Sequence, residues 1–467
     1  MSKSVKRVVK NSFFQTFGAF GITGFNFVLM LGYARILGPE NFGSLVTSQA
    51  QVLVWTILVE LGLSHSLIGA LTLAEGGRTE LSRQGFRARD LLFRVLLVRL
   101  TGAVIGSIFI YFIARAHAGE NEALFWQEVA FAPHLFALAL QQTAVSLAMY
   151  RHRQGLSVLS NLLGVFVTVV LALALAWQGA AIPWLLLAQS WGGMLSAFVI
   201  FSFFFLQSVD RRRSGQTRRL EKAKTAGAWG GEAWRALAQD AWPYAITYGV
   251  FVLWQRMDQI AASRLLGFEQ GGQYALAVRL VAIPILIATS ISFALFPDLQ
   301  RVGRDAPEKV QVILGAVSKV IWRYGILGAA LILLALGYLL VPLVPKFQPA
   351  LKLLPYFVPG VWAFWMQSFL VNALFGIRRY RLVVLVHLKA LGVYLPSLYF
   401  LTNQFELHGV VWAFNIFCLS MCFFGFRAAV KAGVLPANYR LYAAFSAEER
   451  ALWPKVAGPA RFFRRKS

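Results

Sequence analysis

The sequence predicts an all-α polytopic integral membrane protein, on the evidence of its composition, its long apolar runs and the spacing of its basic residues. Of the 467 residues, 58% are apolar and 14% are charged, whereas a soluble chain carries roughly a quarter charged residues. The high apolar content also excludes an intrinsically disordered chain. The two cysteines, Cys418 and Cys422, lie in one apolar run, so no disulfide framework is predicted.

The apolar runs predict about twelve transmembrane helices, because a helix needs about 20 mostly apolar residues to cross a bilayer. The first run follows a basic leader but is too long for the core of a signal peptide. It is therefore interpreted as an uncleaved first helix. The predicted helices cover residues 12–34, 44–74, 91–114, 124–150, 155–177, 183–207, 239–264, 273–298, 318–341, 353–377, 382–402 and 409–430.

The loop charges predict the orientation of the chain in the membrane. Most loop Lys and Arg residues lie before the first helix, after each even-numbered helix and in the tail, and this pattern is typical of cytosolic segments. We therefore expect both termini in the cytosol and an even number of helices. The formal charge of +25 is then explained mainly by topology and by contact with anionic lipid. The outside segments hold only Arg35, Arg115, Arg264, Lys346 and Lys352.

The chain is predicted to consist of two six-helix lobes, an N-lobe over 1–207 and a C-lobe over 239–430. A basic cytosolic linker over 208–238 joins them, and a basic cytosolic tail covers 431–467. The corner after the first helix resembles the corner after the seventh, which predicts a parallel repeat with a pseudo-two-fold axis along the membrane normal and a cavity between the lobes. The aligned residues are Arg35, Leu37, Gly38, Glu40 and Gly43 in the first corner and Arg264, Leu266, Gly267, Glu269 and Gly272 in the second.

Three stretches of the chain resemble bacterial polysaccharide flippases of the Wzx type. The run 34–43 and the segment Glu60-Leu61-Gly62-Leu63-Ser64 are similar to the first third of these proteins, and Trp242 through Phe296-Pro297 is similar to the start of their second half. The family belongs to the multidrug/oligosaccharidyl-lipid/polysaccharide (MOP) exporter superfamily. Twelve spans fit it better than the lipid II flippases, which usually have fourteen helices.

The resemblance implies a function and a location. It implies that the chain moves an undecaprenyl-pyrophosphate-linked oligosaccharide, such as an O-antigen, exopolysaccharide or capsule repeat unit, between leaflets of the bacterial inner membrane by alternating access. Membrane lipids and the lipid-linked oligosaccharide are then its partners, together with the polysaccharide polymerase and the chain-length machinery. The family carries an acidic or polar residue before the Gly-Leu-Ser motif, and Glu60 occupies that position.

Six ionisable residues lie deep inside the predicted helices. Each costs about 2.5–3.5 kcal/mol at mid-bilayer, so they are expected to face protein or water. The four cations are candidate residues for substrate binding and translocation, because guanidinium and ammonium groups bind pyrophosphate oxygens. The two acids are candidate ion-coupling residues. The cations are Arg99, Arg256, Arg279 and Lys389, and the acids are Glu60 and Asp258.

Other roles for these side chains stay open at this stage. Glu60 could pair with Arg99, and Asp258 with Arg279, as clamps between helices. Arg256 and Asp258 point about 160° apart on one helix, so we expect only one of them to line a narrow cavity. Three deep tryptophans are either packing residues or stacking platforms for sugar rings. These are Trp254, Trp362 and Trp365.

Several classes of protein are disfavoured by what the sequence contains. It shows neither a P-loop nor a G-x-G-x-x-G motif after a strand, so transport driven by ATP within this chain is not expected. No nucleic-acid partner, metal or other cofactor is expected either. A cation-coupled drug or metabolite antiporter of the same superfamily is the main alternative. A membrane polysaccharide polymerase or glycosyltransferase is less favoured, because the outside loops are short. The chain is therefore not expected to be an enzyme.

Overall fold

The structure is a computed structural model that describes residues 3–64, 66–67, 88–151, 153–213, 231–305, 307–377, 379–436 and 439. Its secondary structure elements are all helices, so the all-α prediction is confirmed for the described part of the chain. Nine segments within it are long and apolar enough to cross a membrane. Much of the predicted linker over 208–238 and nearly all of the tail beyond residue 436 lie outside the described residues.

The chain divides into two compact units, Met1–Ser263 and Arg264–Ser467. The predicted helix over 239–264 is therefore grouped with the first unit by its packing, while the lobes and the linker stay predictions. The helices of the first unit are α1 (Lys3–Val54), α2 (Thr56–Glu60), α5 (Ala88–Ala118), α6 (Glu122–Val129), α7 (Pro133–Tyr150), α8 (Gln154–Trp177), α9 (Ile182–Arg213) and most of α10 (Gly231–Leu266). Those of the second are α11 (Phe268–Asp305), α12 (Pro307–Leu340), η2 (Pro345–Phe347), α13 (Gln348–Leu353), η3 (Leu354–Phe357), α14 (Val358–Gly376) and α15 (Tyr380–Lys431).

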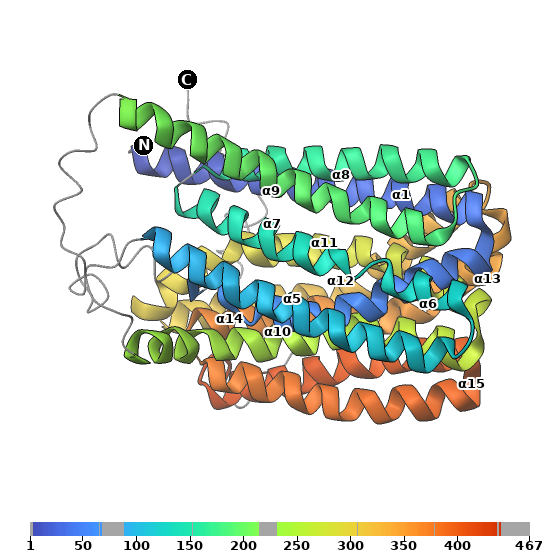
Figure 1. Ribbon diagram of the computed structural model, residues 1–467. Coiled ribbons are helices and arrows are strands. Elements are labelled where there is room, and N and C mark those ends of the chain that lie inside the picture. The colour runs from blue at the N-terminus through green and yellow to red at the C-terminus, as the bar shows by residue number, and fades with distance from the viewer. Residues whose placement is uncertain are drawn as a thin grey trace, which may run out of the picture. The chain divides into compact units, whose positions relative to one another are not determined.

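The two longest elements, α1 and α15, each contain two consecutive helices. Each is 52 residues long and is interrupted by one residue with non-helical dihedral angles. These residues are Gly38 (φ 75°, ψ 174°) and Glu406 (φ 50°, ψ −130°), and both lie between helices that the apolar runs predict. The two halves of α15 run side by side, as the orange and red ribbons show (Figure 1).

The two corners that align in the sequence also share a backbone conformation. Gly38 and Gly267 both have positive φ, at 75° and 93°, and in both corners helix resumes at the next residue. Glycine has no Cβ and adopts this left-handed region readily, so it commonly ends a helix. Pro39 then suits the first position of the following helix, where no backbone N–H is required. The shared conformation supports the expected internal repeat.

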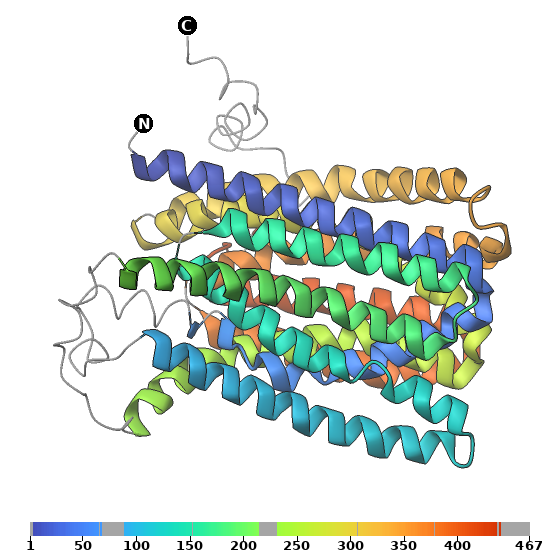
Figure 2. The same ribbon diagram turned by 45° about the horizontal axis from the view of Figure 1, so that its top comes forward.

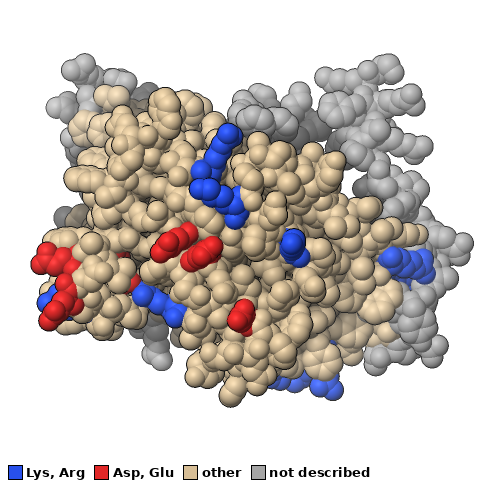
Figure 3. All heavy atoms as spheres, turned by 90° about the vertical axis from the view of Figure 1, so that its right-hand side faces the viewer, with Lys and Arg blue, Asp and Glu red and all other residues tan. Residues whose placement is uncertain are grey.

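Apolar side chains cover much of the outer surface of the predicted spans. Phe112 of α5 is 64% exposed, Trp177 of α8 is 85% exposed and Tyr338 of α12 is 83% exposed. Figure 3 looks onto the end of the helices at the right of Figure 1, where several Asp and Glu side chains gather at one edge and the other charged side chains are scattered. Large exposed apolar surfaces mark contact with another apolar phase, and helices of this length fit the hydrocarbon core of a bilayer.

Small residues allow α8 and α9 to pack closely in the first unit, where both run beside α1 (Figures 1 and 2). Gly164 and Thr168 of α8 face Gly192 and Ser196 of α9. A Cβ at Gly164 would collide with the carbonyl oxygen of Gly192 and lie 3.3 Å from the Cβ of Ser196. Small residues four positions apart are a common way for membrane helices to approach each other.

This close approach predicts that Gly164→Ala destabilises the protein. The added methyl group meets a backbone oxygen that cannot rotate away, and overpacking of this kind costs about 1–3 kcal/mol. Thermal unfolding in detergent, followed by size-exclusion chromatography, should show a lower midpoint. Gly155→Ala on the same helix is the control, because nothing lies within 4 Å of its added Cβ. Equal midpoints for the two variants would contradict the packing argument.

Candidate functional site

The candidate site is built around a break in the helical path of the first unit. After α2 ends at Glu60, Leu61 (φ 41°) and Gly62 (φ 70°) adopt left-handed conformations, and helix resumes at Leu63. A break inside the membrane leaves backbone groups that need partners, and discontinuous helices form the binding sites of many transporters. Helix α10 packs tightly against this break, since a Cβ on Gly62 would lie 2.8 Å from the amide nitrogen of Ala245.

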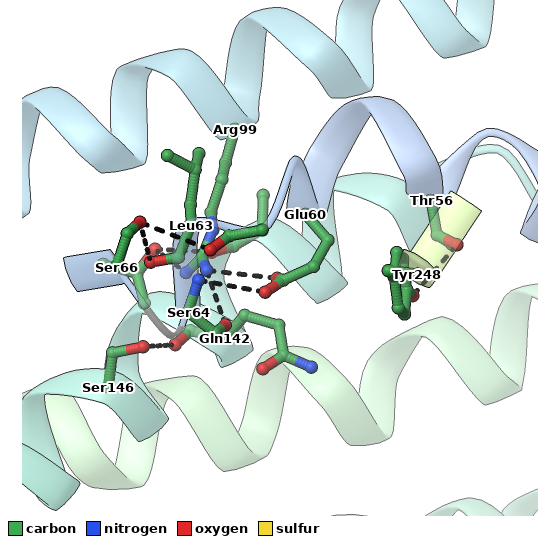
Figure 4. Close-up of polar contacts among 12 residues, drawn as sticks. Thr56, Glu60, Leu63, Ser64, Ser66, Arg99, Gln142, Ser146 and Tyr248 are labelled. Carbon is green, nitrogen blue, oxygen red and sulfur yellow. Dashed lines mark hydrogen bonds and ion pairs between the residues drawn. The ribbon is translucent and has the colours of Figure 1, made fainter. Parts of the chain in front are cut away.

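A buried ion pair lies at this break. Arg99 of α5 is fully buried, and its Nη2 lies 3.1 Å from Oε2 of Glu60 (Figure 4). Arg99 also donates to the hydroxyl groups of Ser64, at 2.8 Å, and Thr143 of α7, at 3.1 Å. The second carboxylate oxygen of Glu60 accepts the backbone N–H of Ser64 at 3.0 Å. The pairing of Glu60 with Arg99, left open by the sequence, is therefore present.

Helix α10 brings further polar groups to the same region. The hydroxyl of Tyr248 lies 3.3 Å from that of Thr56, one turn before Glu60 (Figure 4). Glu60 and Arg256 are both near enough to Tyr248 to act on it electrostatically, and Arg256 also acts on His134 of α7. The structure thus gathers Glu60, Arg99 and Arg256, three of the six predicted residues, within the first unit.

Asp258 has different surroundings from Arg256 on the same helix. It is 2% exposed, and its carboxylate accepts the backbone N–H of Gln259 at 2.7 Å. Arg256 is half-buried. Two residues apart on a helix, the two side chains leave in different directions, as the sequence predicts.

The other two predicted residues lie in the second unit, on separate helices. Arg279 of α11 and Lys389 of α15 are both exposed. The Nζ of Lys389 lies 5.7 Å from the ring centroid of Phe424. The indole N–H groups of Trp362 and Trp365 donate to backbone carbonyls of neighbouring helices, at 3.1 and 2.9 Å, so both rings take part in helix packing. Their stacking on sugar rings stays a prediction.

The sequence prediction does not include the hydroxyl groups of the site, because it rests on deep charges and deep tryptophans. Ser64 could have been predicted from the sequence, since it lies four residues after Glu60 and closely follows the break. Thr143 and Tyr248 could not have been predicted, because only the fold brings α7 and α10 to α2. No group of three or more His, Cys, Asp or Glu residues suited to a metal occurs among the residues that the structure describes.

The fold defines a class of protein, a multi-pass membrane protein with the fold seen in transporters of the MOP superfamily. Over 88% of the chain, the structure matches an inward-facing multidrug resistance MATE family transporter of that superfamily, covering 95% of it (TM-score 0.66, 14% identity). The lipid II flippase MurJ in an inward closed conformation gives a TM-score of 0.65 at 13% identity, over 91% of this chain and 88% of MurJ. The eukaryotic MATE transporter AtDTX14 gives 0.63 at 14% identity, over 97% and 99%.

The sequence itself identifies the family within this class. Residues 8–302 match the family described as polysaccharide biosynthesis protein, which is more than half of the chain. The protein belongs to this family and is Wzx-like, as the resemblance of its motifs implied. No curated protein sequence matches the chain significantly.

The buried ion pair predicts strong coupling between Glu60 and Arg99. Glu60→Gln should destabilise the protein by about 3–5 kcal/mol, because it leaves the guanidinium of Arg99 buried without a counter-charge. Arg99→Gln should destabilise the protein by a similar amount, because it leaves the carboxylate of Glu60 buried without a counter-charge. The double variant removes both charges and should recover much of the loss. Unfolding midpoints of the four proteins in detergent measure this coupling as a double-mutant cycle. Additive losses would show that the pair does not act as a unit.

Proposed function

We propose that this protein is a flippase that moves an undecaprenyl-pyrophosphate-linked oligosaccharide from the cytosolic to the outer leaflet of the bacterial inner membrane. The cargo would be an O-antigen, exopolysaccharide or capsule repeat unit. The observation that carries the proposal is the excess of cations among the deep ionisable residues, in a chain of the polysaccharide biosynthesis family. A pyrophosphate group needs cationic donors, and lipid-linked sugars are the intermediates that such a pathway moves across a membrane.

Arg256 and Arg279 are the proposed ligands of the pyrophosphate. Arg256 is half-buried and Arg279 is exposed, so both guanidinium groups can meet a ligand. Arg99 is fully buried against Glu60, Ser64 and Thr143. It would reach a ligand only if this network opened, and we propose that it mainly orders the region. Lys389 is left out of the pyrophosphate set, because it lies on an exposed apolar face of α15.

Glu60 and Asp258 are the proposed ion-coupling residues. Both carboxylates are buried, with 9% and 2% of their surface exposed, and buried acids in membrane proteins commonly carry protons or cations. A proton on Glu60 would weaken its bond to Arg99 and to the N–H of Ser64 together. Such a change at a helix break is a simple way to couple an ion to a movement of helices.

The proposed transport cycle is alternating access by a twelve-helix protein with two six-helix lobes. Counting both halves of α1 and of α15 as separate spans raises the nine apolar segments of the described residues to eleven, and α10 adds a twelfth long helix. The matching corners at Gly38 and Gly267 support a parallel repeat. In this scheme both termini are cytosolic, and the isoprenoid chain of the substrate stays in lipid while the pyrophosphate and sugars cross.

A drug or metabolite antiporter is the second candidate, because the structure is as similar to MATE multidrug transporters as to MurJ. Substrates of such antiporters are commonly cationic, and a set of deep residues with more bases than acids disfavours them. Resistance to cationic dyes on overexpression, without any effect on surface polysaccharide, would favour this candidate.

The flippase proposal predicts that Arg256→Gln and Arg279→Gln each lower transport by about 10-fold or more, since a charge-assisted hydrogen bond contributes about 1.5–3 kcal/mol. The test deletes the gene, restores each variant at matched protein level and measures surface polysaccharide together with the leaflet of the lipid-linked oligosaccharide. Complete repeat units should accumulate on the cytosolic leaflet.

Arg115→Gln is the matched control, because Arg115 is an exposed cation at the end of α5 whose hydrogen bond, among the described residues, goes to the neighbouring Gly119 carbonyl. It should transport normally. Normal transport by Arg256→Gln, Arg279→Gln and their double variant would refute the cationic ligand set. Accumulation of a truncated glycan in the deletion strain would instead indicate an enzyme.

A further inference from the structure

One surface of the second unit combines an apolar helix face with two cations. The exposed residues on the first half of α15 include Leu385, Leu388 and Val393, each at least 39% exposed. On the second half, Leu419 and Phe423 are 41% and 55% exposed. In a helix that spans a bilayer, an exposed face of this composition contacts the hydrocarbon chains of lipids.

Lys389 and Arg427 interrupt this apolar face. Lys389 follows directly after Leu388 on the first half of α15, and Arg427 lies one turn after Phe423 on the second half. The Nζ of Lys389 is 5.7 Å from the centroid of Phe424, and the Cζ of Arg427 is 5.3 Å from the centroid of Phe423. The two rings are themselves 5.4 Å apart. Each cation is thus held beside one ring of an aromatic pair, at the distance of a cation–π contact.

The protein supplies no carboxylate for these two cations within the described residues. In the sequence, Glu406 is the only Asp or Glu between Glu308 and Glu448, and it lies at the far corner of α15. Three more exposed cations lie at the end of the helix pair opposite the Glu406 corner, which is the end nearer to Lys389 and Arg427. They are Arg379, Arg381 and Lys431. Within the described residues no ion pair joins these cations to a carboxylate, so this end can take up an anion from outside the chain.

The depth of the two cations indicates which anion suits them. Lys389 lies nine residues inside the start of α15 and Arg427 four residues before its end, which is about 13 Å and 6 Å at 1.5 Å per residue. Long cationic side chains at these depths reach toward the headgroup region while their stems stay in the apolar layer. Phosphate is the anionic group found there, attached to acyl chains that fit the apolar face.

We propose that Lys389 and Arg427, flanked by the rings of Phe423 and Phe424, bind the phosphate headgroup of an anionic membrane phospholipid on the lipid-facing surface of α15. The site is distinct from the proposed pyrophosphate ligands Arg256 and Arg279 and does not depend on the flippase function. It gives Lys389 a role at the protein–lipid boundary, where a bound phospholipid would tie the two halves of α15 together.

The test measures lipid retention by the full-length purified protein with native mass spectrometry. The protein is titrated with phosphatidylglycerol, with zwitterionic phosphatidylethanolamine and with undecaprenyl pyrophosphate. Wild-type protein should retain phosphatidylglycerol over phosphatidylethanolamine, and the double variant Lys389→Gln/Arg427→Gln should lower this retention at least 5-fold. Lys389→Arg should keep it, because the charge remains.

Arg381→Gln is the matched control, since it removes an exposed cation of α15 that has no cation–π contact with a ring of the described residues. It should change retention less than 2-fold. An equal loss in Arg381→Gln would overturn the proposal in favour of diffuse charge attraction. Retention of undecaprenyl pyrophosphate but not of phosphatidylglycerol at these residues would overturn it in favour of a substrate site.

If the double variant fails to fold, Phe423→Leu provides the second measurement, because it keeps both charges and an apolar side chain. Loss of the ring that positions Arg427 should then lower phosphatidylglycerol retention about 2- to 5-fold. Unchanged retention in this variant would refute the aromatic part of the site.

Discussion

The ion pair between Glu60 and Arg99 organises the first unit of this protein. A charge taken out of water needs a partner of opposite sign and further hydrogen bonds to offset the cost of desolvation. Here the partner lies on another helix, and Nη2 and Nη1 of Arg99 also donate to Ser64 and Thr143. Helices α2, α5 and α7 are therefore tied to one point, and that point lies where the helical path is broken.

The break and the pair depend on each other. Left-handed conformations at Leu61 and Gly62 turn the chain so that Ser64 can approach Glu60 from the following helix. Leu61 is not a glycine, so its conformation costs energy that its surroundings must offset. Gly62 contributes a second constraint, since α10 lies too close for any larger side chain.

Sequence reasoning could predict the fold class and the corners of this protein, because both depend on local composition. Apolar run length predicts the spans, and Gly38 and Gly267 mark the two corners through the backbone freedom of glycine. The site was predicted less fully. Glu60 and Arg99 stand out as deep charges, but their pairing depends on the packing of α2 against α5. The hydroxyl partners Thr143 and Tyr248 are unremarkable in sequence, since serine, threonine and tyrosine occur throughout membrane helices.

The carboxylate of Glu60 does two things at once, because it neutralises Arg99 and caps the N–H of Ser64 at the start of the next helical segment. The charge of the Glu60 carboxylate and the order of the helical turn that begins at Leu63 are consequently coupled. Loss of the charge on Glu60 would therefore weaken the ion pair and the start of that helical segment together. A change of charge at Glu60 would thus be converted directly into a change of backbone order at Ser64, four residues away in the sequence.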